Sequence, residues 1–415
     1  MVLEDIKISG YGIKNKNVAD KWKRSSFKEL ACLFIEDSRQ SENIKYLLEK
    51  YINEAADGIK ICMKELKINE CKIYLSECYS DFLIELEKQG LKVILVDNHK
   101  AFEAEVFNEH TLVHNAETML ALSRFLSEES YVPRKIVSIA GDVKNPGVYE
   151  IPLGTSLRKI IDEYGNGTES GKTIKFVQVG GNTGTVFTED ELDVAFTYEN
   201  MIGNGTIMQV GKIEVYNIDT CIVKWITEKM LANSKETCGK CVYCREGIYQ
   251  LYKIIKDATE GKGKDSDIDL AIELSETIKV GTLCDFGRSA SNPLYTGINK
   301  FRDEFEKHID RKICNTLDCI SYANYYIDPK ICDGCSKCID CHQGAIKGET
   351  NFIHIIDQDS CDKCGKCEEI CSLKAVKRYG NIKPNLPLEP IEAGSFEESA
   401  FVEKKGLGLG RRRRK

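Results

Sequence analysis

The stretch Cys238-Gly239-Lys240-Cys241-Val242-Tyr243-Cys244-Arg245-Glu246-Gly247 carries three cysteines at two-residue spacing, and a fourth, Cys284, follows about forty positions later. Apolar residues at helical spacing fill most of the interval, so two helices would return the chain and bring Cys284 to the first three. Three close thiolates and one remote thiolate are what a single iron–sulfur cluster requires. The sequence therefore predicts a four-helix unit around one [4Fe-4S] cluster, over residues 216–312.

The composition favours a multidomain protein of a reducing compartment. A chain of 415 residues with 42% hydrophobic content can bury several cores, and its net charge of −7 gives no reason to expect nucleic-acid binding. The 19 cysteines follow no apolar leader, and the apolar run from Leu91 to Val96 is far shorter than the ~20 residues of a membrane helix. We expect a cytoplasmic protein without membrane insertion. The basic tail, Arg411 to Lys415, is either a solvated end or a docking segment for an acidic partner.

A second cysteine-dense region lies near the C-terminus. Its two halves, Cys332-x-x-Cys335-x-x-Cys338-x-x-Cys341-His342 and Cys361-x-x-Cys364-x-x-Cys367-x-x-x-Cys371-Ser372, resemble the bacterial two-cluster ferredoxin pattern. That resemblance implies one cluster on Cys332, Cys335, Cys338 and Cys371, and another on Cys361, Cys364, Cys367 and Cys341. The first half is one residue shorter, and the usual proline after the fourth cysteine is absent from both halves. Because Gly344-Ala345-Ile346 keeps its place relative to Cys341, we put the deletion between Cys338 and Cys341.

Zinc is the alternative for all twelve cysteines, because paired Cys-x-x-Cys motifs are common in zinc ribbons. Runs of three cysteines with a remote fourth favour clusters instead. A separate candidate zinc site combines His308, Cys314 and Cys319, which are close in sequence, with the leftover Cys221 as fourth ligand. The competing interpretation is that these are unliganded thiols and a surface histidine.

The first 130 residues predict an α/β domain. Residues 1 to about 40 are weakly patterned, and no function is assigned to them. The elements expected after them are a helix from Ser41 that ends near Gly58, a strand at Cys71–Leu75, a helix at Asp81–Gln89 and a buried strand at Leu91–Val96. Four cysteines without ligand spacing are expected to be ordinary thiols: Cys32, Cys62, Cys71 and Cys78. The few glycines before Gly141 are scattered, so we predict no phosphate-binding loop.

Residues 131–215 predict a small α+β domain of β-grasp type. Its expected elements are a hairpin of Ile136–Gly141 and Val148–Ile151 around an Asn-Pro-Gly turn, a helix at Leu157–Tyr164, and a strand at Ile174–Val179. A structural or docking role is the preferred interpretation of this domain.

From Lys135 to about Gly380 the chain resembles the family of NADH-binding, flavin-bearing subunits of respiratory complex I, in the longer form found in electron-bifurcating [FeFe]-hydrogenases and NAD-dependent formate dehydrogenases. The residues that carry the resemblance are the central cysteine motif, Leu283-Cys284, Asn292-Pro293, Phe301-Arg302-Asp303-Glu304 and His308-Ile309. The segment Gly141 to Val148 is similar to the family's soluble-ligand-binding β-grasp (SLBB) domain. In the N-terminal half, His114-Asn115-Ala116-Glu117-Thr118 resembles the family's Asn-Asn-Val-Glu-Thr segment, but its glycine-rich loop has no match. The resemblance therefore implies a shortened, degenerate flavin domain without FMN or NAD.

These observations predict a multidomain α/β and α+β protein. Its parts are a degenerate α/β domain (1–130), the β-grasp domain (131–215), the helical [4Fe-4S] domain (216–312), a zinc-like connector with a two-cluster ferredoxin-like domain (313–383) and a tail (384–415). We expect an electron-transfer subunit with three [4Fe-4S] clusters and a candidate zinc ion. The resemblance implies as partners a thioredoxin-like [2Fe-2S] subunit and a flavoprotein, hydrogenase or formate dehydrogenase-type subunit, with ferredoxin as a further candidate. The alternative is an NAD(P)H-oxidising subunit with a divergent FMN site.

Overall fold

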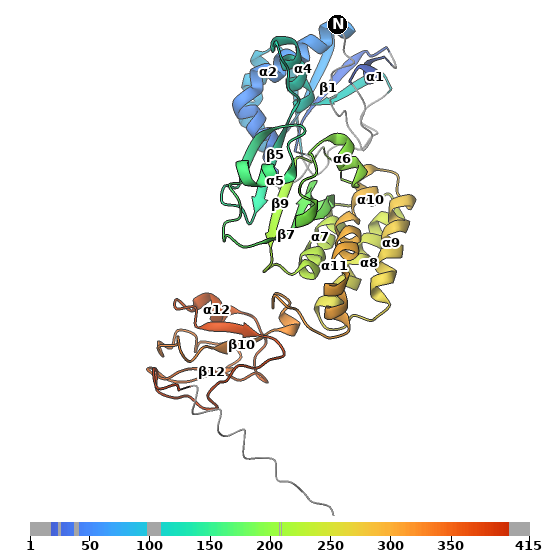
Figure 1. The fold of residues 1–415 in the computed structure, drawn as a ribbon. Helices are drawn as coiled ribbons and strands as arrows, with labels where there is room; N and C mark the ends of the chain where they lie inside the picture. Colours follow the sequence, from blue (N-terminus) through green and yellow to red (C-terminus); the bar gives the residue numbers. More distant parts are fainter. Residues whose placement is uncertain are drawn as a thin grey trace, which may run out of the picture. The chain divides into compact units, whose positions relative to one another are not determined.

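The computed structural model describes residues 18–23, 26–36, 41–97, 109–206, 208 and 210–397, so the basic tail lies outside the described residues. The chain divides into two compact units (Figure 1). The first contains the residues up to Thr220, 225–253 and 269–302. The second contains 221–224, 254–268 and the chain from Asp303 onward.

The first unit begins with a parallel α/β sheet. Its four strands have the order β3 (Lys92–Val96), β2 (Glu70–Ser76), β1 (Glu29–Phe34) and β4 (Thr111–Asn115), and every neighbouring pair is parallel. The helices are α1 (Val18–Trp22), α2 (Asn43–Leu66), the 3-10 helix η2 (Glu77–Phe82), α3 (Leu83–Lys88) and α4 (Ala116–Ser127). The long helices α2 and α4 pack on each other, and the predicted α/β alternation is confirmed.

Two expectations for this sheet are wrong. Helix α2 does not end near Gly58 but continues to Leu66, because Gly58 serves a helix contact: a Cβ there would lie 1.8 Å from the carbonyl oxygen of Met119 in α4. Strand β3 is at the edge of the described sheet rather than buried, and Leu95 is 40% exposed. The pattern of β3 is apolar although, among the described strands, it pairs only with β2.

A five-stranded mixed sheet follows, with the order β6-β5-β9-β7-β8. The strands are β5 (Arg134–Gly141), β6 (Gly147–Pro152), β7 (Ile174–Val179), β8 (Thr185–Thr188) and β9 (Lys212–Asn217), and only the β5–β9 pair is parallel. Helix α5 (Leu157–Lys159) runs into a π-helical turn at Ile160–Tyr164, and α6 (Tyr198–Gly203) precedes β9. The short 3-10 helices are η5 (Gly181–Thr183) and η6 (Glu189–Glu191). The predicted hairpin, helix and strand are therefore present in that order.

The next segment is helical, as predicted. Its helices are α7 (Ile222–Glu236), α8 (Val242–Thr259), α9 (Asp267–Gly281), the short α10 (Asp285–Ser289) and α11 (Asn292–Ile309). In the first unit, aromatic rings join these helices to the mixed sheet: Phe176 of β7 packs edge-to-face on Trp225 of α7 and on Phe301 of α11. Beside them, Glu214 of β9 is buried between Lys212 at 3.2 Å and Lys229 at 2.8 Å.

The second unit contains the cysteine-rich C-terminal region. This region begins with the 3-10 helix η7 (Ile320–Tyr322) and contains one short α-helix, α12 (Lys366–Ile370). Two antiparallel strand pairs follow η7: β10 (Asn324–Ile327) with β13 (Val376–Tyr379), and β11 (Ile346–Lys347) with β12 (Ile355–Ile356). A small core includes Tyr325, Ile346 and Val376, and six partly buried cysteines pack against it. Among the described residues, no helix is long and apolar enough to cross a membrane.

Candidate iron–sulfur and metal centres

The four central cysteines come together at the ends of helices in the first unit. Cys241 and Cys244 flank the start of α8, and Cys284 caps α10, where its Sγ accepts a hydrogen bond from the Gly287 N–H at 3.4 Å. Burial, followed by the nearby thiols of Cys284, Cys238 and Cys241, raises the pKa of Cys244 to about 12. A thiol that is this hard to ionise among three other thiols needs a cationic partner to become a thiolate, and the irons of an iron–sulfur cluster supply one.

The surroundings of this site are apolar and accessible. Cys238 and Cys284 are exposed, and Leu283 beside Cys284 is 83% exposed. Gly281 allows the ring of Tyr243 to pack against the end of α9, because a Cβ at this position would lie 2.6 Å from that ring. A redox centre held here would be close to the protein surface, which single-electron exchange with another protein requires.

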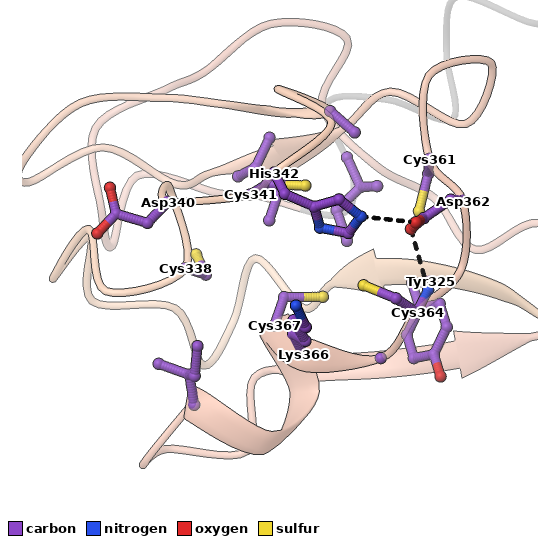
Figure 2. Close-up of a pocket in the computed structure, with 15 residues that line it drawn as sticks. Tyr325, Cys338, Asp340, Cys341, His342, Cys361, Asp362, Cys364, Lys366 and Cys367 are labelled. Carbon is purple, nitrogen blue, oxygen red and sulfur yellow. Dashed lines mark hydrogen bonds and ion pairs between the residues drawn. The ribbon is translucent and has the colours of Figure 1, made fainter.

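The C-terminal cysteines line a cavity in the second unit. Cys341, Cys361, Cys364 and Cys367, the predicted ligands of one cluster, all border it, together with Cys338, as Figure 2 shows. Burial and then the thiol of Cys332 raise the pKa of Cys338 to about 12, with smaller contributions from Cys367 and Cys335, so three of the other predicted ligands are also close to one another. Their fourth predicted partner, Cys371, packs on the same small core.

The backbone shows which residues of the two halves correspond. The N–H of Gly344 donates to the carbonyl of Cys341 at 2.8 Å, and the N–H of Lys374 donates to the carbonyl of Cys371 at 3.0 Å. These matching turns make Cys341 the counterpart of Cys371. They support the placement of the one-residue deletion before Cys341.

A different kind of site lies elsewhere in the second unit. Cys221, His308, Cys314 and Cys319 are all buried, and their ligand atoms lie within 4.8 Å of one another. The Cys221 Sγ is 3.3 Å from His308 Nε2 and 3.7 Å from the Cys319 Sγ. The Nδ1 of His308 lies 2.7 Å from the carbonyl of Glu304, which fixes the tautomer that leaves Nε2 free to bind a metal. The competing interpretation of a surface histidine is wrong for His308, which is 2% exposed.

The charge state of this buried group is unusual. Hydrogen bonds with the thiols of Cys221 and Cys319 lower the pKa of Cys314 strongly. Burial alone would lower the pKa of His308, but contacts with Cys221 and Cys314 outweigh it and raise this pKa to about 10. This pocket favours a thiolate next to a protonated histidine, and a zinc ion that took the place of the proton would find the donor set of a structural zinc site.

Spacing separates the two kinds of site. Within the described ranges, only two groups of three or more potential ligands lie within 4.8 Å of one another: the set just described, and His342 with Asp362 and Cys364. None of the three predicted cluster sets is that compact. A single tetrahedral ion needs ligand atoms about 3.8 Å apart, whereas four irons hold their thiolates further apart.

The segment that resembles the family's Asn-Asn-Val-Glu-Thr motif has structural contacts. His114 is buried in β4 and accepts a hydrogen bond from the Trp22 indole N–H at 3.0 Å. Asn115 caps α4 by accepting from the Thr118 N–H at 2.9 Å. Glu117 accepts from the Ile136 N–H at 2.6 Å and also binds Lys135. Glu117 therefore joins the α/β domain to the mixed sheet, whereas the contacts of His114 and Asn115 lie within the α/β domain.

Comparison with known families gives the class of protein. Residues 225–308 match the iron-sulfur binding region of NADH-ubiquinone oxidoreductase-F, and residues 136–187 match the SLBB domain. The first match contains all four central cysteines, and the second lies within the predicted β-grasp domain. The chain is thus related to the family of NADH-binding subunits through its SLBB and iron–sulfur domains, and the resemblance seen in the sequence is confirmed over about half of the chain.

The individual relatives are components of redox complexes. The chain is 38% identical over 218 residues to the NADP-reducing hydrogenase subunit HndC of Solidesulfovibrio fructosivorans, a match that covers 51% of this chain and 44% of the relative. It is 32% identical over 214 residues to the F subunit of the NADH-quinone oxidoreductase of Streptomyces coelicolor, covering 49% and 47%. The chain thus spans less than half the length of these relatives.

A solved structure, an NAD+-reducing [NiFe]-hydrogenase in the H2-reduced state, has a similar fold, with a TM-score of 0.64 at 20% identity. The fold likeness covers 74% of this chain and 62% of the hydrogenase chain.

Proposed function

We propose that this protein is an electron-transfer subunit that relays single electrons through three [4Fe-4S] clusters between other redox subunits. The observation that carries this proposal is the convergence of Cys238, Cys241, Cys244 and Cys284 inside the matched iron–sulfur region. When bound, each cluster would accept and donate one electron. The chain's own residues hold the thiolates, limit access of water and set the local charge.

The two remaining clusters are assigned to the C-terminal region, which we propose to be a two-cluster ferredoxin-like domain. One cluster would be held by Cys332, Cys335, Cys338 and Cys371, and the other by Cys361, Cys364, Cys367 and Cys341. The shared cavity and the matching turns at Cys341 and Cys371 support this assignment. The exchange of fourth ligands between the two halves would place the clusters close together, as a relay requires.

We propose further that the N-terminal α/β domain binds neither FMN nor NAD. In nucleotide-binding α/β folds a phosphate lies at the N-terminus of a helix that follows a strand. Here Glu36, just after β1, occupies the start of α2: its Oε1 accepts hydrogen bonds from the Ile44 N–H at 2.7 Å and the Lys45 N–H at 3.3 Å. A carboxyl group in this position takes the N–H groups that would bind a phosphate.

The names of the relatives suggest the kind of partner. They are subunits of a hydrogenase and of NADH-quinone oxidoreductases, so we propose that this chain works in a comparable multisubunit redox complex. A thioredoxin-like [2Fe-2S] subunit and a flavoprotein, hydrogenase or formate dehydrogenase-type subunit are the partners expected from the resemblance. The fourth buried group, Cys221 with His308, Cys314 and Cys319, is proposed to bind zinc in a structural role.

The test is iron, sulfide, zinc and flavin analysis of one anaerobically purified sample. The relay predicts about twelve irons and no stoichiometric flavin in the isolated chain. Stoichiometric FMN that is bleached by NADH would refute it and would establish the alternative, an NAD(P)H-oxidising subunit.

A further inference from the structure

A histidine–aspartate pair lies at the rim of the C-terminal cavity (Figure 2). The Nε2 of His342 lies 2.8 Å from Asp362 Oδ2, and Asp362 Oδ1 accepts a hydrogen bond from the Cys364 N–H at 3.2 Å. His342 directly follows Cys341, whereas Asp362 directly follows Cys361. The pair therefore connects the two stretches of chain that supply the ligands of one proposed cluster.

The other half of the domain lacks this connection. Asp333 is the counterpart of Asp362, since its Oδ1 accepts from the Cys335 N–H at 3.0 Å. Ser372 is the counterpart of His342, because the matching turns at the two fourth cysteines put it directly after Cys371. No hydrogen bond or ion pair joins Ser372 to Asp333 within the described part of the chain. The two halves thus carry the same aspartate, but only Asp362 is hydrogen-bonded to a histidine, whereas Asp333 has a through-space charge interaction with His354.

We propose that His342 is a positioning residue that sets the reduction potential of the cluster held by Cys341, Cys361, Cys364 and Cys367. It does so by holding Asp362 and offsetting its charge. This inference rests on the proposed function, which assigns a cluster to these cysteines. An ionised carboxylate beside a cluster disfavours the addition of an electron. An N–H donor on that carboxylate weakens the effect, so the pair makes this cluster easier to reduce than an unpaired aspartate would.

The two ends of the pair should act in opposite directions. His342→Ala leaves the Asp362 charge without its donor, so the potential of this cluster falls. Asp362→Asn keeps the size and the acceptor oxygen but removes the charge, so the potential rises. We expect the two variants to differ by at least tenfold in the ratio of reduced to oxidised cluster, which is 59 mV for one electron. His342→Gln retains an N–H donor and should return the potential towards the wild-type value.

The matched variants in the other half provide the control. Asp333→Asn should raise only the potential of the other C-terminal cluster, and Ser372→Ala should change neither. The measurement is an anaerobic redox titration of the full chain followed by electron paramagnetic resonance, after iron analysis has shown that each variant keeps the wild-type iron content.

Opposite shifts at full iron content would support the proposal. Three outcomes would overturn it: potential shifts of the same sign from His342→Ala and Asp362→Asn, no shift in either variant, or an equal shift from Ser372→Ala. Each would mean that the substitutions only loosen the packing around the cluster or that the pair does not affect its potential. A wild-type chain with only about four irons would overturn the proposed C-terminal clusters and this inference together, and the iron analysis alone would reveal it.

Discussion

Replacing one member of the buried Cys221, His308, Cys314 and Cys319 group should release a zinc ion and leave the iron in place. Tetrahedral zinc with Zn–S bonds of about 2.3 Å and Zn–N bonds of about 2.0 Å implies edges of about 3.8 Å between sulfurs and about 3.5 Å between sulfur and nitrogen. The observed separations are 3.7 Å for the Cys221 and Cys319 sulfurs, and 3.3 Å and 3.5 Å from these sulfurs to His308 Nε2. The pocket therefore has the dimensions of one zinc ion.

The expected size of the effect follows from the ligand count. Structural zinc sites bind with roughly 10–16 kcal/mol, so one ligand of four represents about 3 kcal/mol, or about a hundredfold in affinity. We expect Cys319→Ala to lose its zinc during purification, whereas the wild type retains one ion per chain. The assay is elemental analysis of zinc and iron in the same anaerobic sample.

Cys62→Ala is the matched control, because Cys62 is another fully buried thiol but lies in helix α2 of the α/β domain. It should retain both zinc and iron. The reasoning fails if the wild type contains no zinc, if Cys319→Ala keeps a full equivalent, or if the variant loses iron instead of zinc. Loss of iron would mean that this group ligates a cluster.

Three further outcomes are expected. Cys241→Ala should remove the central cluster, so that iron falls from about twelve to about eight per chain while the C-terminal spectra persist; unchanged iron would contradict the central assignment. Gly58→Ala puts a Cβ 1.8 Å from the Met119 carbonyl oxygen and should lower the free energy of unfolding by about 3 kcal/mol. The control Gly203→Ala adds a Cβ in open space and should change the free energy of unfolding by less than about 1 kcal/mol. Equal effects of the two variants in thermal unfolding would refute the close contact at Gly58. Burial would raise the pKa of Glu214, but Lys229 and Lys212 outweigh it and lower this pKa. The contribution of Glu214 to stability is therefore present above its unfolded pKa and is lost as the pH falls through its folded pKa. In denaturation measured from pH 7 downward, Glu214→Gln should reduce this loss of stability at acid pH.

The local elements with clear signals were predictable from sequence. The turn of Asn, Pro and Gly between β5 and β6 identified the hairpin, and the spacing of Cys238 to Cys244 identified the central site. Strand β1 was missed because it lies in the weakly patterned first forty residues, although it is in the middle of the sheet. Its sequence, Glu-Leu-Ala-Cys-Leu-Phe, is apolar on both faces, so it lacks the alternation that reveals a half-buried strand.

Contacts between distant segments were harder to predict. Gly58 looked like the end of a helix because a sequence does not show which glycine lies against a second backbone. Cys221 entered the zinc set only as a leftover cysteine, 87 positions from His308, and the fold was needed to put the two atoms 3.3 Å apart. The bond between His342 and Asp362 had no sequence signal beyond the missing proline, since it depends on how two ligand loops face each other.

The α/β domain has a structural role that does not depend on a nucleotide. Its Asn43 donates to the Gly211 carbonyl at 2.8 Å and accepts from the Ser138 hydroxyl at 2.6 Å, and its Glu117 pairs with Lys135, which is 3% exposed. Without this domain, the mixed sheet would lose these hydrogen bonds and this ion pair, and a hydrogen bond contributes about 0.5–1.5 kcal/mol to stability. The mixed sheet in turn supports α7 and α11 through Phe176. The proposed absence of a flavin site therefore does not make the domain dispensable, because it stabilises the sheet that supports the iron–sulfur helices.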